Sequence, residues 1–138
     1  MMRFVVNCKA VPQGSVKSFI VNTKGGRQRA VITHSKSQTL YEVRQAIITE
    51  YLNAGGVNYR DKAVRIHVLF SFTRPKSVSA KKRPYMTVKS DLDKLTRMLL
   101  DSLTTIAYDD DSQVVELNAK KVYGEHDFIE VTIDEYTD

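Results

Sequence analysis

The sequence predicts a single α+β domain in which two main helices pack on one mixed β-sheet. Apolar residues alternate along residues 62–72, which is typical of a half-buried strand. Apolar residues recur at three- and four-residue steps along residues 39–53 and 93–104, as they do on amphipathic helices. The length of 138 residues fits one domain, and we expect that domain to span residues 1–138.

The N-terminal part is expected to supply three strands and the first helix. Residues 3–9 are rich in β-branched and aromatic side chains, which predicts a first strand. Residues 16–22 and 29–33 predict a hairpin, because the paired glycines between them suit a tight turn. A helix follows over residues 39–53 and is stopped by a second glycine pair. Its buried face should carry Leu40, Val43, Ile47 and Tyr51.

The C-terminal part is expected to supply three strands and the second helix. The strand of residues 62–72 should turn four apolar side chains to one side and its charged ones to the other. Residues 74–89 lack periodicity and predict a loop, followed by a helix over residues 93–104. Residues 113–123 and 128–134 predict a closing strand pair. The apolar sets are Val64, Ile66, Val68 and Phe70 on the strand, and Leu95, Leu99 and Leu103 on the helix.

The charge distribution suggests two surfaces with different tasks. Residues 1–90 contain 17 Lys and Arg but 3 Asp and Glu, whereas residues 91–138 contain 4 and 13. A basic surface suits a phosphate backbone, because neutralising phosphates releases counterions. An acidic cluster suits a divalent cation. The alternative is that both surfaces are solvated and that their charges pair with one another.

Other features of the sequence argue against several functional classes. No apolar run approaches the roughly 20 residues that cross a bilayer, and the first residues are too polar for a signal peptide. The single cysteine, Cys8, allows no internal disulfide and fits a reducing cytoplasm. The sequence has no glycine-rich phosphate loop. We therefore expect neither a membrane protein nor a nucleotide cofactor.

Two acidic groups flank the second predicted helix. Asp91 and Asp93 stand at its start, where Ser90 and Asp93 fit a capping-box variant and acidic residues suit the helix dipole. Residues 109–111 are three consecutive aspartates, which repel one another unless water or a cation screens them. One interpretation is a capped helix followed by a solvated acidic turn. The other is a carboxylate site for Mg²⁺, which prefers oxygen ligands.

Chain length limits the metal-site interpretation. A helix over residues 93–104 is about 18 Å long, and the seven residues from Thr104 to Asp111 span at most about 23 Å. Asp111 therefore reaches Asp91 within one subunit only if the chain runs back along the helix. A helix that continued well past Ile106 would require a site shared across a dimer.

Basic residues lie beside the acids. Residues 74–89 contain six Lys and Arg and no Asp or Glu, which predicts a flexible loop that grips a DNA backbone. Tyr85 in this loop could stack on an unpaired base, although the loop could equally be a mobile solvated segment. Arg97 shares a helix face with Asp93 and Asp101, where it forms either surface ion pairs or a phosphate clamp.

Three separated segments resemble the core pattern of the RusA family of Holliday junction resolvases. The family pattern runs D-x-D-N-L-x-K, then D-A-L, then D-D-x-Q-V. Here the segments read Asp91-Leu92-Asp93-Lys94-Leu95-Thr96-Arg97, Leu100-Asp101-Ser102-Leu103 and Asp110-Asp111-Ser112-Gln113-Val114. The resemblance is specific over residues 90–123, and elsewhere it is general.

The resemblance implies a homodimeric endodeoxyribonuclease that depends on Mg²⁺ or Mn²⁺. It implies paired symmetric nicks in four-way DNA junctions during recombination and repair, in the bacterial cytoplasm. Such proteins are often encoded by bacteriophages and prophages. Asp91, Asp93 and Asp111 match the metal-binding carboxylates, with Asp110 beside them, and Asp101 matches a further acidic position.

The sequence departs from the family pattern at two positions. Lys94 replaces the usual Asn and adds a cation next to the acids, and Arg97 replaces the usual Lys. If that Lys must exchange a proton, Arg97 lowers activity; if it only stabilises charge, Arg97 serves. We favour the second, because phosphodiester cleavage depends on charge stabilisation. Lys121 fits a basic position of the family, where it contacts phosphate or pairs with an acid.

The resulting hypothesis is a structure-selective endonuclease. Asp91, Asp93 and Asp111 hold Mg²⁺, water activated there attacks the phosphorus, and Arg97 stabilises the developing charge. The expected DNA contacts are Arg74, Lys76, Lys81, Lys82, Arg83, Lys94 and Lys121. One alternative is a nuclease that cuts flaps and other branched DNA more broadly. The other is a junction-binding module that is inactive because of Lys94 and Arg97.

Overall fold

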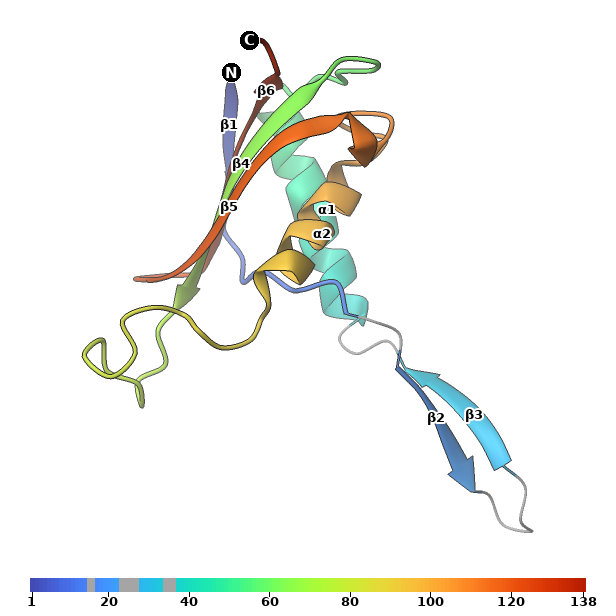
Figure 1. Cartoon of the computed structure of the whole chain (residues 1–138), viewed down its shortest axis with the longest axis vertical. Coiled ribbons are helices and arrows are strands. Elements are labelled where there is room, and N and C mark those ends of the chain that lie inside the picture. The colour runs from blue at the N-terminus through green and yellow to red at the C-terminus, as the bar shows by residue number, and fades with distance from the viewer. Residues whose placement is uncertain (15–16, 23–27, 34–36) are drawn as a thin grey trace.

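The computed structural model of the chain describes residues 1–14, 17–22, 28–33 and 37–138 (Figure 1). Along these residues the order is three strands, a helix, a strand, a helix, a short 3₁₀ helix and two strands. Apart from the 3₁₀ helix, this is the predicted order. The predicted α+β class is therefore confirmed.

Four strands form one mixed sheet. Their order across the sheet is β1 (Met2–Val6), β6 (Phe128–Glu135), β4 (Val64–Thr73) and β5 (Val114–Gly124). β6 is antiparallel to both β1 and β4, whereas β4 and β5 are parallel. A parallel pair needs a long crossover, and residues 74–113 supply it. β5 is left at one edge of the sheet, and β4 lies between it and β6. The predicted closing strand pair is therefore wrong, because both strands pair with β4 instead of with each other.

Two helices, α1 (Ser37–Asn53) and α2 (Leu92–Leu103), cover the same face of this sheet (Figure 1). The predicted apolar sides of β4 and α2 face the core between these layers, and their side chains are at most 4% exposed. On α1, the predicted Val43, Ile47 and Tyr51 are also buried. Among the described residues, no helix combines the length and apolar character that crossing a membrane requires.

The predicted hairpin forms, but it does not join the main sheet. β2 (Lys17–Asn22) and β3 (Gln28–Thr33) pair only with each other, antiparallel. In Figure 1 this hairpin extends away from the four-stranded sheet. The predicted glycine turn falls on residues 23–27, which lie outside the described residues.

Some element boundaries differ from prediction. The first strand, expected over residues 3–9, ends at Val6 because its partner strand offers no pairing beyond Ile129. The backbone then turns, with Cys8 N donating to Val6 O at 3.1 Å. α1 begins at Ser37 rather than at residue 39, and β4 runs over Val64–Thr73 rather than residues 62–72. Strand ends are set by partners, which a local pattern does not contain.

Candidate active site

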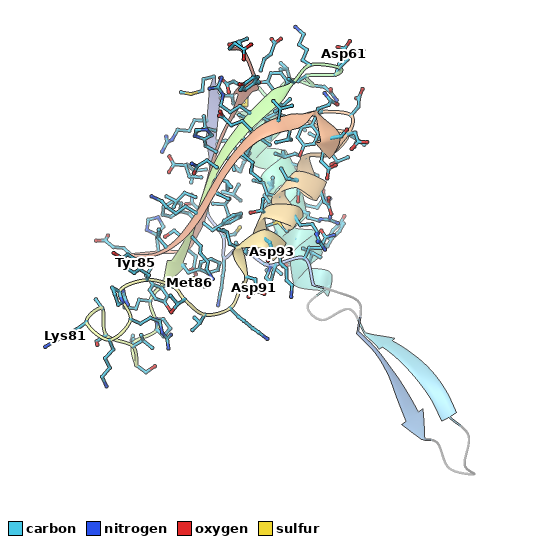
Figure 2. The ribbon with its side chains drawn as sticks, in the orientation of Figure 1. Asp61, Lys81, Tyr85, Met86, Asp91 and Asp93 are labelled. Atoms are coloured by element: carbon cyan, nitrogen blue, oxygen red, sulfur yellow. The ribbon has the colours of Figure 1, made fainter. Side chains whose placement is uncertain are left out.

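The start of α2 presents two carboxylates. Asp91 is the N-cap, but its side chain makes no capping hydrogen bond, and Asp93 follows in the first turn (Figure 2). The predicted capping box at Ser90 and Asp93 is therefore wrong. The helix begins only after Asp91, and Ser90 O instead accepts a hydrogen bond from Lys121 Nζ at 2.8 Å. Helix capping thus does not account for either carboxylate.

The other end of α2 allows the chain to return. The helix ends at Leu103, before Ile106, as a site within one subunit requires. A tight turn follows, in which Thr105 has a φ of 71° and its N–H donates to Tyr108 O at 2.7 Å. Tyr108 is fully buried, and its hydroxyl donates to Leu100 O at 2.7 Å. This turn reverses the direction of the chain, so that Asp111 lies beside α2.

Asp110 has a structural role on the returning segment. It caps the 3₁₀ helix η1 (Asp111–Gln113), with Asp110 Oδ1 accepting from Ser112 N at 3.1 Å. Gln113 completes the capping box, because its Oε1 accepts from Asp110 N at 3.1 Å. Gln113 Nε2 also donates to Lys62 O at 3.0 Å, which fastens the turn to the start of β4. The side chain of Asp110, which was predicted to bind a metal ion, therefore caps η1.

The pKa values of the two adjacent aspartates diverge. The Ser112 N–H, more than any other contact, lowers the pKa of Asp110. The pKa of Asp111 is raised, first by its hydrogen bond with Asp110, then by desolvation and by the charges of Asp110 and Asp101. Negative charge is therefore concentrated around Asp111, and a cation there would relieve the repulsion.

A pocket between α2 and β5 brings three of the predicted residues together. Its volume is about 630 Å³, and Asp93, Arg97 and Asp111 line it on an otherwise mostly apolar surface. Asp91 and Asp110 do not line it. The other lining residues, which were not predicted, are Leu92, Thr96, Leu100, Leu117 and Ala119.

The donors in this pocket suit Mg²⁺ arriving with a phosphate. In the described ranges no three or more His, Cys, Asp or Glu side chains lie close enough to hold a metal ion. Mg²⁺ is commonly held by one or two carboxylates together with substrate phosphates and water. Asp93 and Asp111 are both exposed, and neither belongs to an ion pair within the described part of the chain. The described residues therefore do not assemble the predicted ligand set of Asp91, Asp93, Asp110 and Asp111, and Asp93 and Asp111 remain as an open pair of carboxylates.

The three charged residues predicted to share one face of α2 have different surroundings. Asp101 Oδ2 lies 3.5 Å from Arg44 Nη2 on α1, and Arg44 Nη2 also donates to Gln13 Oε1 at 2.8 Å. Asp101 thus joins the two helices. Arg97 is exposed and takes part in no ion pair among the residues described, so the ion-pair alternative for Asp93 and Arg97 is not seen.

Lys94, one of the two departures from the family pattern, contacts its own helix start. Lys94 Nζ lies 3.7 Å from Asp91 Oδ2, and both side chains are about half exposed. An exposed pair of this kind contributes little to stability. Its local effect is to place a positive charge against Asp91, the predicted ligand outside the pocket.

The basic loop is folded around Arg74. The Arg74 guanidinium donates to Arg83 O, and to Pro84 O at 3.3 Å, and lies 4.4 Å from the ring centroid of Tyr123. These contacts join Arg74, at the start of the loop, to residues 83–84 and to β5. The guanidinium of Arg74, a predicted DNA contact, therefore makes its contacts within the protein. The predicted Lys76, Lys81 and Lys82 are exposed, and Figure 2 shows Lys81 at the far end of the loop.

Lys121 makes a contact that the sequence did not suggest. Its Nζ donates to Val88 O at 2.7 Å and to Ser90 O at 2.8 Å. We expected either a phosphate or an acid as its partner. The two carbonyls belong to the segment that enters Asp91, so Lys121 fixes that segment against β5. Backbone carbonyls 31 and 33 residues away leave no pattern in the sequence.

Comparisons with known proteins bear on the whole chain. A family model described as "Endodeoxyribonuclease RusA" matches residues 10–134, a range that includes every predicted site residue. The uncharacterized protein YqaN of Bacillus subtilis (strain 168) is 30% identical over 126 residues. That alignment covers 80% of this chain and 87% of YqaN.

Proposed function

The chain belongs to the RusA endodeoxyribonuclease family, and on this basis we propose that it resolves four-way DNA junctions in a Mg²⁺-dependent reaction. Mn²⁺ would substitute for Mg²⁺. Two copies would act as a symmetric dimer, since paired nicks in opposed strands need paired sites. The setting would be recombination and repair of phage or host DNA in the bacterial cytoplasm.

The observation that carries this proposal is the pocket between α2 and β5. It combines carboxylates from two separate elements, Asp93 and Asp111, with the guanidinium of Arg97. Neither carboxylate serves as a helix cap with its side chain, so both retain oxygens for a ligand.

Each residue would have a distinct role in this pocket. Asp93 and Asp111 would hold Mg²⁺ together with phosphate oxygens of the substrate and water. When bound, the cation would lower the pKa of water and offset negative charge on the phosphodiester. Arg97 would bind a non-bridging phosphate oxygen, and its fixed guanidinium would stabilise charge that develops there. Lys76, Lys81 and Lys82 would hold the DNA backbone.

Cleavage of a synthetic four-way junction tests the proposal. Wild-type protein with Mg²⁺ should nick opposed strands symmetrically, and a chelator should abolish the nicks. Asp93→Asn should lower the cleavage rate at least about 100-fold with an unchanged unfolding midpoint. Asp109→Asn is the matched control, because Asp109 is an exposed aspartate of the same acidic run as Asp111 but does not line the pocket.

The same assay separates the two alternatives. Comparable cleavage of flaps, three-way and four-way junctions would favour a broader branched-DNA nuclease. Junction binding without cleavage, in both wild type and Asp93→Asn and with either Mg²⁺ or Mn²⁺, would favour an inactive binding module. In that second case, restoration of cleavage by Lys94→Asn with Arg97→Lys would assign the inactivity to the two departures.

A further inference from the structure

A second hollow lies beside the candidate active site, and we call it the base cleft. Its volume is about 540 Å³, and it opens where β4 ends, between the segment after β1, the basic loop and the end of β5. A volume of this size is typical of sites for small molecules.

The base cleft lies next to the pocket between α2 and β5, which we call the active-site pocket, and both are lined by residues of β5. Ala119, Lys121 and Tyr123 pair with Val68, Phe70 and Phe72 of β4, which places the three on the inner face of the sheet. Ala119 lines the active-site pocket, and Tyr123 lines the base cleft. The Lys121 contacts to Val88 O and Ser90 O separate the two hollows. From Ala119 to Tyr123 the strand advances only about 13 Å.

The chemistry of the base cleft suits a nucleotide. Its walls include the buried side chains of Val11, Phe72 and Met86, together with the half-buried ring of Tyr123. Three cations, Lys9, Arg83 and Lys89, also line it, whereas no Asp or Glu among the described residues does. Apolar and aromatic walls accept the planar base, and the cations complement the phosphate attached to it.

We propose that the base cleft takes one unpaired nucleobase from the branch point of the DNA substrate. This inference rests on the proposed function, because Ser90 lines the cleft and Asp91 follows it directly. A strand with its phosphate at the carboxylates would therefore bring a nearby nucleotide to the cleft. Unstacking a base costs least where pairing is already disturbed. The cleft would then favour branched DNA over an intact duplex.

The experiment uses four-way junctions with 2-aminopurine at successive positions around the branch point, bound to full-length protein without divalent cations. One position should become protected from acrylamide quenching, while the same base in an intact duplex should not. Val88→Trp should fill the cleft, since Val88 lines it and is 40% exposed. This variant should abolish the protection and bind the junction about tenfold more weakly, equivalent to about 1.4 kcal/mol.

Control variants separate the cleft from general effects. Leu52→Trp adds the same side chain at an exposed site on α1 and should behave as wild type. If Val88→Trp does not fold, Lys9→Gln with Lys89→Gln tests the exposed rim and should lower the protection. Absence of protection at every position in wild type, or full protection in the folded cleft variants, would overturn the inference.

The outcomes also distinguish this inference from the proposed function. If the wild-type protein cleaves the junction but protects no base, the cleft does not bind a nucleobase, and the proposed nuclease function is unaffected. Protection of one base without cleavage under any metal would remove junction cleavage and leave the cleft as a binding site.

Discussion

Asp110 and Asp111 are adjacent in sequence but differ in what their side chains contact. Asp110 accepts the Ser112 N–H and caps η1, whereas Asp111 lines the active-site pocket. The pKa of Asp110 is lowered by its cap, and the pKa of Asp111 is raised by its neighbour. The ionised carboxylate of Asp110 therefore stabilises the turn, whereas the surroundings of Asp111 disfavour its ionised form.

Substitutions at these two positions should have opposite effects. Asp110→Ala should lower the unfolding midpoint at pH 7 by a few degrees, and activity should largely persist. A depressed pKa stabilises the fold above the unfolded-state pKa, and this stabilisation disappears as pH falls through the folded-state pKa. The difference from wild type should therefore vanish in acid.

Asp111→Asn should instead abolish cleavage without lowering the midpoint, because the ionised form of Asp111 is disfavoured in the folded protein. Thermal scans of both variants between about pH 3 and pH 7, the range in which carboxylates titrate, provide the measurement when paired with the junction assay. Loss of stability in Asp111→Asn comparable to that in Asp110→Ala would contradict this division of roles.

Lys121 binds the backbone that leads into Asp91, and we expect it to act as a positioning residue. Lys121→Met should lower kcat about tenfold or more, since misplaced catalytic groups are costly, while KM changes little. Lys121→Arg should restore part of the rate. Lys120→Met is the matched control, because neighbouring strand residues face opposite sides of the sheet. A weaker junction affinity with a smaller salt dependence, rather than a lower kcat, would show that Lys121 contacts phosphate instead.

At the scale of elements, the turn after α2 determines where Asp111 lies. Tyr108→Phe removes the hydrogen bond from the hydroxyl to Leu100 O and should destabilise the protein by about 1 kcal/mol. Tyr41→Phe is the control, because Tyr41 is 64% exposed. Urea unfolding measures both variants. Equal midpoints for Tyr108→Phe and wild type would mean that the hydroxyl does not hold the turn.

The elements with strong periodicity could be predicted from the sequence. Leu95, Leu99 and Leu103 are fully buried on α2, as their spacing predicts, because one helix face packs on the sheet. The end of β1 could not be predicted, since its pairing is limited by β6. The separation of the β2–β3 hairpin from the main sheet likewise depends on partners distant in the sequence.

The candidate site was predictable in its residue types but not in its supporting contacts. The predicted site combined Asp91, Asp93 and Asp111 with Arg97. All but Asp91 line one pocket. The capping box was expected at Ser90, but the N-cap of α2 is Asp91, and the Ser90 carbonyl accepts a hydrogen bond from Lys121. A capping box forms instead at Asp110. Arg74 was expected to contact DNA, whereas its guanidinium binds loop carbonyls. Such long-range contacts to backbone atoms do not appear as motifs.

At the scale of the whole molecule, part of the charge asymmetry is resolved by pairing across the sheet. Arg65 lies 3.5 Å from both Glu116 and Asp134, and Lys62 lies 3.6 Å from Glu135. The alternative of mutual pairing is therefore correct for this surface. Among the described ion pairs, none includes a lysine of the basic loop, so the positive charge of that loop is not offset by an acidic side chain there.

Salt dependence tests the role of the loop. Lys81→Gln with Lys82→Gln should weaken DNA binding and reduce the slope of log K against log salt by about 1.8, or about 0.9 for each phosphate that the variant no longer neutralises. Lys62→Gln should leave the slope unchanged, because Lys62 lies at the opposite end of β4 and pairs with Glu135. Titrations at several salt concentrations provide the slopes, and an unchanged slope in the double variant would exclude the loop lysines as backbone contacts.

All the predicted metal ligands and DNA contacts lie between Arg74 and Lys121, within the crossover and the strand that it leads to. Two parallel strands cannot be joined by a short turn, so the sheet needs a long detour at this point in any case. The residues of the candidate site lie on this crossover and on β5. Sequence changes in β2, β3 and the outer surface of α1 can therefore accumulate without moving the residues of the candidate site.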